Sequence, residues 1–561
     1  MSRNNVGSLL RAAFEALVVA FTLIVFDDNR VAAEEETDLP EVSIGERLFL
    51  EMRFAQFFFM HSHGDANAML AYGDPVLDAT TTTVASFPGP FAGQSMNCRA
   101  CHLVDEHSGQ PGGGNRTYAD FARRSPVSAR EDGQLTTPRN SPPLVNAALF
   151  RRNFLLHFDG EFRTMEDLVK GTLTGRNYGW LPQETEQASA HIAHIIRQDD
   201  GNGDLAQKFG GAYRVVLAGV DPALPPEFRL SPQFRITDVA RASDEKILNV
   251  VEQLIAAYVN SLEFARDEEG AFTGSPFDVF LRKNGLPQQP NAGESPLAYS
   301  RRLVGLVEAL TAPIFVNETD GTFTTHAQPF VFAAQELAGF KIFAREPLSL
   351  PLSSEALVQG GIGNCAACHP LPALTDFSFH NTGATQEEYD AIHGAGAFAA
   401  LSIPDLDTRK GNFELFLPPT AKHPQAFGPF LAVPAFEKRG LTDLGLWNVF
   451  ANPDKRKAQQ PIRHLLTQAL GVHLSPRELL PRTIALFKTP GLRDLSHSAP
   501  YLHTGGKDTL TDVIQFYRAM ADLARRGALR NGAPQLEGIA LTPTDGPSLA
   551  AFLRALNEDY E

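Results

Sequence analysis

The sequence predicts a mainly α-helical protein built from two similar modules, with long loops and insertions. Apolar residues recur at helical spacing in several segments, whereas the alternation typical of strands is scarce. One short cysteine–histidine motif also occurs twice, beginning at Cys98 and again at Cys365. A repeated motif with similar flanking segments indicates a repeated structural unit.

The size and charge of the chain exclude several classes of protein. At about 150 residues per domain, 561 residues suggest three or four domains, or two enlarged ones. Hydrophobic residues make up 43% and charged residues 20%, which is typical of globular proteins and not of disordered or fibrous ones. The net charge of −16 argues against a surface that neutralises phosphates, so we expect no nucleic-acid partner.

Residues 1–33 are typical of a secretory signal peptide. Arg3 and Arg11 form a basic start, residues 16–26 are apolar, and Val31-Ala32-Ala33 provides small residues for cleavage. The apolar run is short for a bilayer span, so we expect an exported protein that is not an integral membrane protein. An uncleaved N-terminal anchor is the alternative, because Asp27, Asp28 and Arg30 make the end of the segment polar.

The four cysteines form two copies of C-x-x-C-H with none left over. This pattern marks covalent attachment of c-type haem: two thiols one helical turn apart form thioethers, and the adjacent histidine ligates the iron. A redox disulfide or half of a zinc site is the alternative for a single copy, and the second copy disfavours it. The expected haem-binding residues are Cys98, Cys101 and His102, and Cys365, Cys368 and His369.

Short lead-in segments precede both motifs. Residues 44–49 and 336–343 each contain a glycine and end in phenylalanine, and each is predicted to be helical. The stretch 109–143 is rich in Gly and Pro and predicts a loop. We therefore expect two cytochrome c-like haem domains at 34–284 and 331–561, joined by a linker or insertion at 285–330.

Four further helices are predicted from caps and periodicity. Ser243 is an N-cap, followed by acidic residues and an apolar stripe that continues to Arg266. Ser275-Pro276 starts a second helix. The other two helices are expected at 510–526 and 545–557, the last opened by Thr542-Pro543-Thr544-Asp545.

Several stretches resemble the bacterial dihaem cytochrome c peroxidase and MauG superfamily, over most of the chain beyond residue 33. The most specific is Phe487-Lys488-Thr489-Pro490-Gly491-Leu492-Arg493-Asp494, followed by Ala499-Pro500-Tyr501-Leu502-His503. The others are 137–146, 157–160 and 375–383. The resemblance implies that peroxide reacts at the N-terminal haem, held by His102, while the C-terminal haem, held by His369, stores and relays electrons.

The resemblance also bears on whether the first haem iron has a distal ligand. The family's peroxidases place a distal histidine between the first motif and the Arg-Asn-x-Pro segment. This chain has no histidine between His107 and Asn140, and His107 follows His102 too closely to reach the opposite haem face. We therefore expect an open first iron, as in MauG.

The sixth ligand of the second haem has two candidates. Counting from Gly505 by the interval at which relatives place a Met reaches Tyr517, as in MauG, and Met520 lies one turn further along. We favour Tyr517. A phenolate should lower the haem potential, whereas a thioether raises it. Alternatively, both side chains are core contacts.

One calcium ion is also implied, since relatives hold it through an Asn side chain and two backbone carbonyls. The matching residues are Asn140, Ser498 and Pro500. Oxygen ligands suit this hard cation. A simple turn role for Asn140 remains an equal alternative.

The acid–base group departs from the family pattern. Phe158 stands where relatives have Trp, and Tyr178 stands where they have a distal Glu, with Glu184 and Glu186 slightly later. Cleavage of the O–O bond needs a proton carrier, and a carboxylate suits this role better than a phenol near neutral pH. We name Tyr178 and Glu184 as the candidates, with pocket lining as the alternative for Tyr178.

These expectations together describe a periplasmic dihaem oxidoreductase. It would reduce hydrogen peroxide with electrons from a small periplasmic cytochrome c or cupredoxin. The first alternative is a MauG-like oxidase that uses peroxide to oxidise a protein or organic substrate. The second is a dihaem electron carrier without catalysis.

Overall fold

The computed structural model describes residues 38–81, 86–89, 91–102, 124–147, 149 and 155–559. The predicted signal peptide and His107 lie outside these ranges, as does the part of the predicted 109–143 loop before residue 124. The part from 124 onward has no helix or strand, as predicted. Within the described ranges, no helix is both long and apolar enough to cross a membrane.

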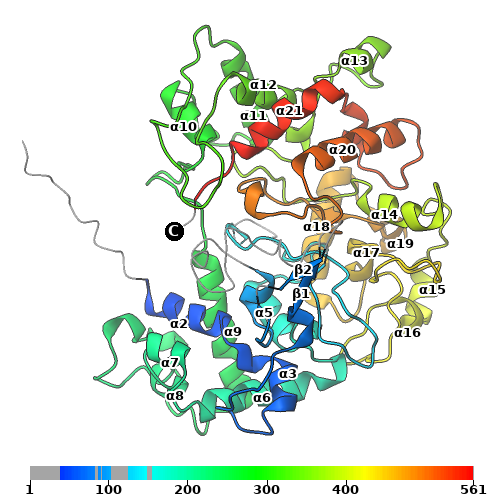
Figure 1. Ribbon diagram of the computed structural model, residues 1–561. Coiled ribbons are helices and arrows are strands. Elements are labelled where there is room, and N and C mark those ends of the chain that lie inside the picture. The colour runs from blue at the N-terminus through cyan, green and yellow to red at the C-terminus, as the bar shows by residue number, and fades with distance from the viewer. Residues whose placement is uncertain are drawn as a thin grey trace, which may run out of the picture.

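The protein is mainly α-helical, which confirms the predicted fold class (Figure 1). Strands in the described ranges form two short antiparallel pairs. In the first, Ala79 lies opposite Pro88; in the second, Phe379 lies opposite Lys488. The pairs are β1 (Ala79–Thr81) with β2 (Ser86–Pro88), and β3 (Phe379–His380) with β4 (Phe487–Lys488).

The first hydrophobic core lies between residues 42 and 262. Its central helix is α9, which begins after Ser243 as predicted, and the Ser243 hydroxyl accepts a hydrogen bond from the Lys246 amide. The helix ends at Ser261, earlier than the predicted Arg266. The helices around this core are α2 (Pro40–Phe49), α3 (Gln56–His61), α5 (Met165–Leu173), α6 (Thr185–Gln198), α7 (Asp204–Lys208), α8 (Tyr213–Val216) and α9 (Asp244–Ser261).

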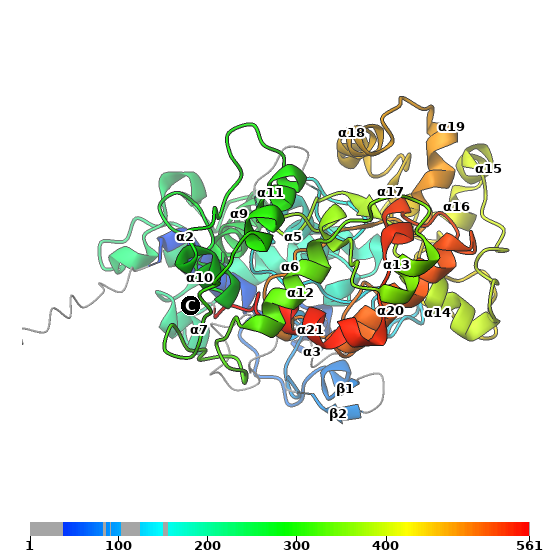
Figure 2. The same ribbon diagram turned by 90° about the horizontal axis from the view of Figure 1, so that it is seen from above.

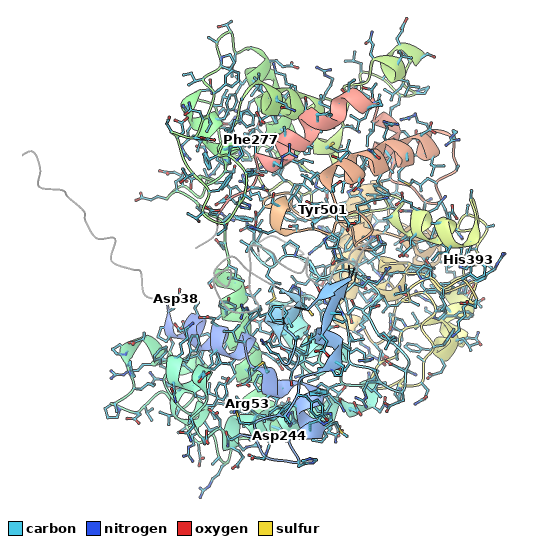
Figure 3. The ribbon with its side chains drawn as sticks, in the orientation of Figure 1. Asp38, Arg53, Asp244, Phe277, His393 and Tyr501 are labelled. Atoms are coloured by element: carbon cyan, nitrogen blue, oxygen red, sulfur yellow. The ribbon has the colours of Figure 1, made fainter. Side chains whose placement is uncertain are left out.

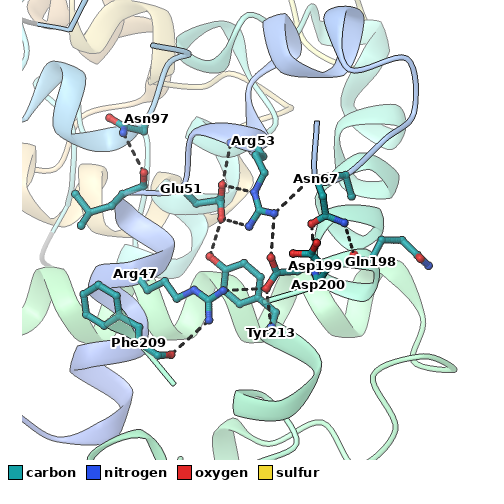
Figure 4. Close-up of polar contacts among 12 residues, drawn as sticks. Arg47, Glu51, Arg53, Asn67, Asn97, Gln198, Asp199, Asp200, Phe209 and Tyr213 are labelled. Atoms are coloured by element: carbon teal, nitrogen blue, oxygen red, sulfur yellow. Dashed lines mark hydrogen bonds and ion pairs between the residues drawn. The ribbon is translucent and has the colours of Figure 1, made fainter. Parts of the chain in front are cut away.

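Buried charges fix α2 against the loops of this first core (Figure 4). Arg47 is fully buried, donates to Asp199 at 2.9 Å and stacks 3.7 Å from the Tyr213 ring centroid. Arg53 donates to Asp199 at 3.0 Å and to Glu51. Each buried charge therefore has an opposite partner, which is the condition for burying it without a large desolvation penalty.

The second core includes four helices that the sequence predicted. The lead-in segment forms α12, and the three capped segments form α10, α20 and α21. The helices of this region are α10 (Pro276–Lys283), α11 (Pro296–Glu308), α12 (Ala334–Ala344), α13 (Ser354–Gln359), α20 (Leu510–Arg525) and α21 (Gly546–Arg554).

The two lead-in helices have the same close packing, which supports the idea of a repeated module. A Cβ on Gly45 of α2 would lie 2.2 Å from the Leu254 carbonyl oxygen of α9. A Cβ on Gly339 of α12 would lie 1.9 Å from the Ser548 carbonyl oxygen of α21. Glycine is needed at both positions because the backbones of the paired helices nearly touch.

A third core lies between residues 379 and 487, around the fully buried Trp447, with one residue from outside, Leu155. Its shorter helices α15, α16 and α19 lie at the far end of the molecule from α2 and α7 (Figures 1 and 2). Its helices are α14 (Ala384–His393), α15 (Leu406–Gly411), α16 (Phe413–Phe416), α17 (Leu446–Val449), α18 (Gln459–Leu470) and α19 (Pro476–Leu479).

The cores do not follow the predicted domain limits closely. The predicted linker 285–330 contains α11, whose Tyr299 and Leu303 belong to the second core, and the predicted domain 331–561 contains a separate third core. In Figure 3, Phe277 of the second core, Arg53 beside the first and His393 of α14 lie in three different regions of the molecule. The assignment of one haem to each predicted domain stays a prediction.

Candidate functional site

The first C-x-x-C-H motif forms one helical turn, α4 (Cys98–Cys101). Asn97 caps this turn by accepting a hydrogen bond from the Ala100 amide at 2.9 Å, and it donates to the Leu50 carbonyl at 3.0 Å. Burial raises the pKa of Cys98 to about 11 and that of Cys101 to about 12. Neutral, buried thiols are poor thiolate nucleophiles, and their surroundings suit uncharged thioethers.

His102 follows directly, and a backbone carbonyl orients its ring. Its Nδ1 lies 2.9 Å from the Pro142 carbonyl oxygen, and burial lowers its pKa to about 4. A neutral imidazole that donates from Nδ1 keeps its Nε2 lone pair for a metal. The residues of this motif therefore fit a haem.

The second motif repeats this arrangement. Cys365–Ala367 forms a short 3-10 turn, and His369 Nδ1 lies 2.9 Å from the Leu374 carbonyl oxygen. Burial lowers the pKa of His369 and raises that of Cys365 to about 12. Both predicted attachment sites thus combine a cysteine whose pKa burial raises with an imidazole oriented by a backbone carbonyl.

One cavity adjoins the first motif and the segment that follows the second motif. Cys98 and His102 line it on one side, and segments 373–377 and 488–494 line it on the other. Leu374, which orients His369, lies within the first of these segments. Most of the lining is apolar, as expected for a site that holds a porphyrin. The other residues used below that line it are Phe158, His157, Arg493 and Asp494.

Tyr178, a predicted acid–base residue, lies beside the first attachment site. Its hydroxyl is 3.1 Å from Cys98 Sγ, and its side chain is 1% exposed. Burial raises its pKa well above the ordinary value, so the phenol is neutral. It is absent from the described residues that line the cavity. The geometry therefore favours contact with the attachment sulfur over proton transfer to a ligand.

Glu184, the other predicted acid–base residue, takes part in a structural network. Arg130 donates to both of its carboxylate oxygens at 2.7 and 2.9 Å, and the Leu181 amide donates at 2.8 Å. Although burial acts to raise its pKa, these hydrogen bonds lower it. Glu184 is also absent from the described cavity lining, so its position does not favour the predicted role.

Tyr517 and Met520, the two candidates for the sixth ligand, occupy different surroundings on α20. The pKa of Tyr517 is raised, mainly by burial and also by the nearby Cys368 and Cys365. Met520 is buried, and its Sδ packs so closely on Gly383 that a Cβ there would lie 2.5 Å from the sulfur. Proximity to the second motif therefore favours Tyr517, and Met520 acts as a core contact.

The structure brings together two of the three predicted calcium residues. The Asn140 side-chain nitrogen donates to the Pro500 carbonyl, and its side-chain oxygen accepts from the Ser141 amide at 3.0 Å. Ser498 donates from its hydroxyl to the Asp494 carbonyl at 3.0 Å. In this orientation the Asn140 side chain connects its own segment directly to the segment that contains Pro500. A calcium ion there would require the Asn140 amide group to rotate so that its oxygen faces the ion.

His503 is a residue to which the sequence reasoning gave no role. Its ring stacks on Phe487 with centroids 3.5 Å apart, and Phe158 contacts it edge-on at 6.4 Å. Nε2 lies 3.2 Å from the Thr385 hydroxyl, and burial lowers the pKa of His503 to about 3. The sequence feature that could have identified His503 as a site residue is its position in the Pro-Tyr-x-His segment. This aromatic group packs behind the cavity wall at Phe158.

No family model matches the chain. It is 34% identical over 77 residues to cytochrome-c peroxidase IdrP1 of Denitromonas iodatirespirans, a match that covers 14% of this chain and 19% of that protein. It is 27% identical over 199 residues to cytochrome-c peroxidase IdrP2 of Pseudomonas sp. (strain SCT), covering 30% of this chain and 50% of the relative. The matches thus span half or less of these curated relatives.

Two solved structures resemble the model over most of its length. The diheme peroxidase BthA of Burkholderia thailandensis E264 aligns with a TM-score of 0.42 and 17% identity, over 93% of this chain and 86% of that one. A MauG-like protein associated with microbial copper homeostasis aligns with a TM-score of 0.42 and 16% identity, over 93% and 91%.

Proposed function

We propose that this chain, a member of the dihaem cytochrome c peroxidase and MauG superfamily, is a periplasmic enzyme that reduces hydrogen peroxide with two covalently attached c-type haems. The observation that carries the proposal is the repeated geometry of the motifs. His102 and His369 each direct Nδ1 to a backbone carbonyl at 2.9 Å, beside a cysteine whose pKa burial raises. The first site borders a cavity that is also lined by Ala373, Thr375 and Phe377, which follow the second motif in sequence.

The haems would be held by Cys98, Cys101 and His102, and by Cys365, Cys368 and His369. Haem iron supplies peroxide binding and electron transfer. The net reaction takes hydrogen peroxide, two protons and two electrons to two molecules of water. A reduced small cytochrome c or cupredoxin would supply the electrons through a haem held by His369, and a haem held by His102 would supply the site for peroxide binding.

The residues of the chain itself orient the ligands and exclude water. The Pro142 and Leu374 carbonyls hold the two imidazoles in one tautomer, which keeps Nε2 directed to a metal. Phe158 lines the cavity, and the His503 ring lies between it and Phe487 in an aromatic group that forms part of the cavity wall. Because His503 is neutral, this wall carries no charge that would draw water into the cavity.

A MauG-like oxidase is the second candidate, and the position of Tyr517 favours it. If Tyr517 held the second iron as a phenolate, it would lower the haem potential and so favour withdrawal of electrons from a substrate. In that case peroxide is consumed only when an oxidisable protein or organic substrate is present.

The test is low-temperature EPR of the fully ferric, full-length protein, followed by peroxide turnover with a reduced small cytochrome c. One high-spin and one low-spin signal, with turnover that His102→Gly abolishes, would support the proposal. Peroxide consumption that needs an organic or protein substrate would favour the oxidase. Two low-spin signals with no turnover, before or after partial reduction, would leave an electron carrier and refute both enzymes.

A further inference from the structure

A second cluster of metal-type ligands lies outside the haem motifs. His326 comes from the segment between α11 and α12, and Asp494 and His497 come from the 3-10 turn that follows β4. One ligand atom from each of the three lies within 4.8 Å of the other two. Their side chains are 1%, 8% and 2% exposed, so the cluster is buried.

The two histidines face the two oxygens of the Asp494 carboxylate. His326 Nε2 lies 3.1 Å from Asp494 Oδ1, and His497 Nδ1 lies 3.0 Å from Asp494 Oδ2. The two imidazole rings are stacked, with centroids 4.1 Å apart and planes at 17°. Both rings therefore present a nitrogen to the same carboxylate.

Hydrogen bonding alone does not satisfy this cluster. Besides Asp494 Oδ1, two more oxygens lie near His326 Nε2: the Glu558 carbonyl oxygen at 3.2 Å and Asp559 Oδ1 at 3.8 Å. Three oxygens therefore surround one nitrogen that has at most one hydrogen to donate. Asp494 Oδ1 and His326 Nδ1 are both buried without a hydrogen-bond partner. Buried polar atoms of this kind are rare and call for a missing partner.

We propose that His326, Asp494 and His497 bind one divalent transition-metal ion of the zinc type. Two imidazoles and a carboxylate are the donor set of three-ligand zinc sites, which leave the fourth position for water or another oxygen. Asp559 borders the cluster and is itself fixed by the hydroxyls of Thr324 and Thr325 at 2.8 and 2.6 Å. The proposal does not depend on the haem chemistry.

The ion would join two segments that are distant in sequence and that meet beside the C-terminal segment. Figure 1 shows the C-terminal segment descending from α21 toward the region between the first and second cores. It brings Asp559 to His326, while Asp494 belongs to the cavity wall. The ion would thus fix the 317–330 loop, beside the C-terminal segment, to the stretch that lines the haem cavity.

A second acidic–histidine cluster provides an internal comparison. His157, Asp159 and Glu161 also lie within 4.8 Å of one another by their ligand atoms. However, Asp159 pairs with Arg139 at 2.6 Å and Glu161 pairs with Lys455. Because cations of the protein already neutralise both carboxylates, we expect no transition-metal ion there.

The test uses the full-length holoprotein, purified without a histidine tag and dialysed against a chelator. Zn²⁺ is titrated in competition with a chromophoric chelator, and the metal content is measured against haem. The expected result is one Zn²⁺ per two haems, with no displacement by excess Mg²⁺. Absence of tight Zn²⁺ binding by the wild type, or an X-ray absorption spectrum at the zinc edge without imidazole ligands, would overturn the proposal.

Substitutions of the two cluster histidines test whether the ion binds at this cluster. We expect His326→Ala and His497→Gln each to weaken Zn²⁺ binding at least tenfold, with unchanged haem content and far-UV circular dichroism. His157→Ala, in the comparison cluster, and His473→Ala, on the surface, should retain it. Retained binding in both cluster variants would overturn the assignment. If these variants fail to fold, the zinc-edge spectrum of the wild type still decides.

Discussion

The hydroxyl of Tyr178 lies 3.1 Å from the sulfur of Cys98, in surroundings that keep both groups neutral. A phenol in this position can donate a hydrogen bond to the attachment sulfur, whether that sulfur is a thiol or a thioether. We therefore expect Tyr178 to influence the first motif through the Cys98 sulfur.

Tyr178→Phe tests this relationship. We expect the loss of one buried hydrogen bond, about 1 kcal/mol of stability, and a decrease in peroxide turnover of less than tenfold. Steady-state turnover and the reduction potential of the first haem are the measurements. A hundredfold fall in kcat with an unchanged potential would instead restore Tyr178 as the acid–base group.

Tyr517→Phe and Met520→Leu form a matched pair on α20. Because Tyr517 lies near both cysteines of the second motif and Met520 packs on Gly383, we expect the tyrosine substitution alone to change the low-spin haem spectrum. EPR and near-infrared absorption of the ferric protein provide the readout. A change in Met520→Leu with an unaltered spectrum in Tyr517→Phe would assign the thioether as ligand.

Gly339→Ala should destabilise the second core strongly. The added Cβ would lie 1.9 Å from the backbone carbonyl oxygen of Ser548, so α12 and α21 must move apart, at a cost of about 3 kcal/mol or more. Gly305→Ala, at an exposed position in α11 with open space around it, should raise stability by about 0.5–1 kcal/mol. Urea unfolding followed by circular dichroism compares the two, and equal effects would contradict the close packing.

Glu558 gives the protein a distinct pH dependence. Burial raises its pKa to about 8, so between about pH 4.5 and pH 8 the folded protein holds a proton that the unfolded chain releases. Stability should therefore fall as pH rises through this range, by up to about 1.4 kcal/mol per pH unit from this group. Glu558→Gln should flatten the decline and Glu268→Gln, at an exposed site, should not. Parallel profiles for wild type and Glu558→Gln would refute the assignment.

The sequence predicted the elements whose signals are local. Ser243 and Ser275 cap α9 and α10 as expected, and each C-x-x-C-H motif begins with a short helical turn, while haem attachment there stays a prediction. The third core was not predicted, because its helices are short and are held together by contacts distant in sequence, such as those of Trp447. The ion pair of Arg130 with Glu184 was not predicted either, because the fold, and not the spacing of residues in the sequence, determines which partner a carboxylate meets.

The unpredicted third core is bound to the first by shared charge. Arg139 pairs with Asp159, which like Arg139 lies within the sequence span of the first core, and with Asp443, which lies within the segment of the third core. Arg124 likewise reaches Glu388 of α14 at 2.8 Å. Separation of these regions would leave the buried Asp443 without its guanidinium partner, which is costly. The first and third cores should therefore melt in a single calorimetric transition, and a protease should find no stable fragment that ends between them.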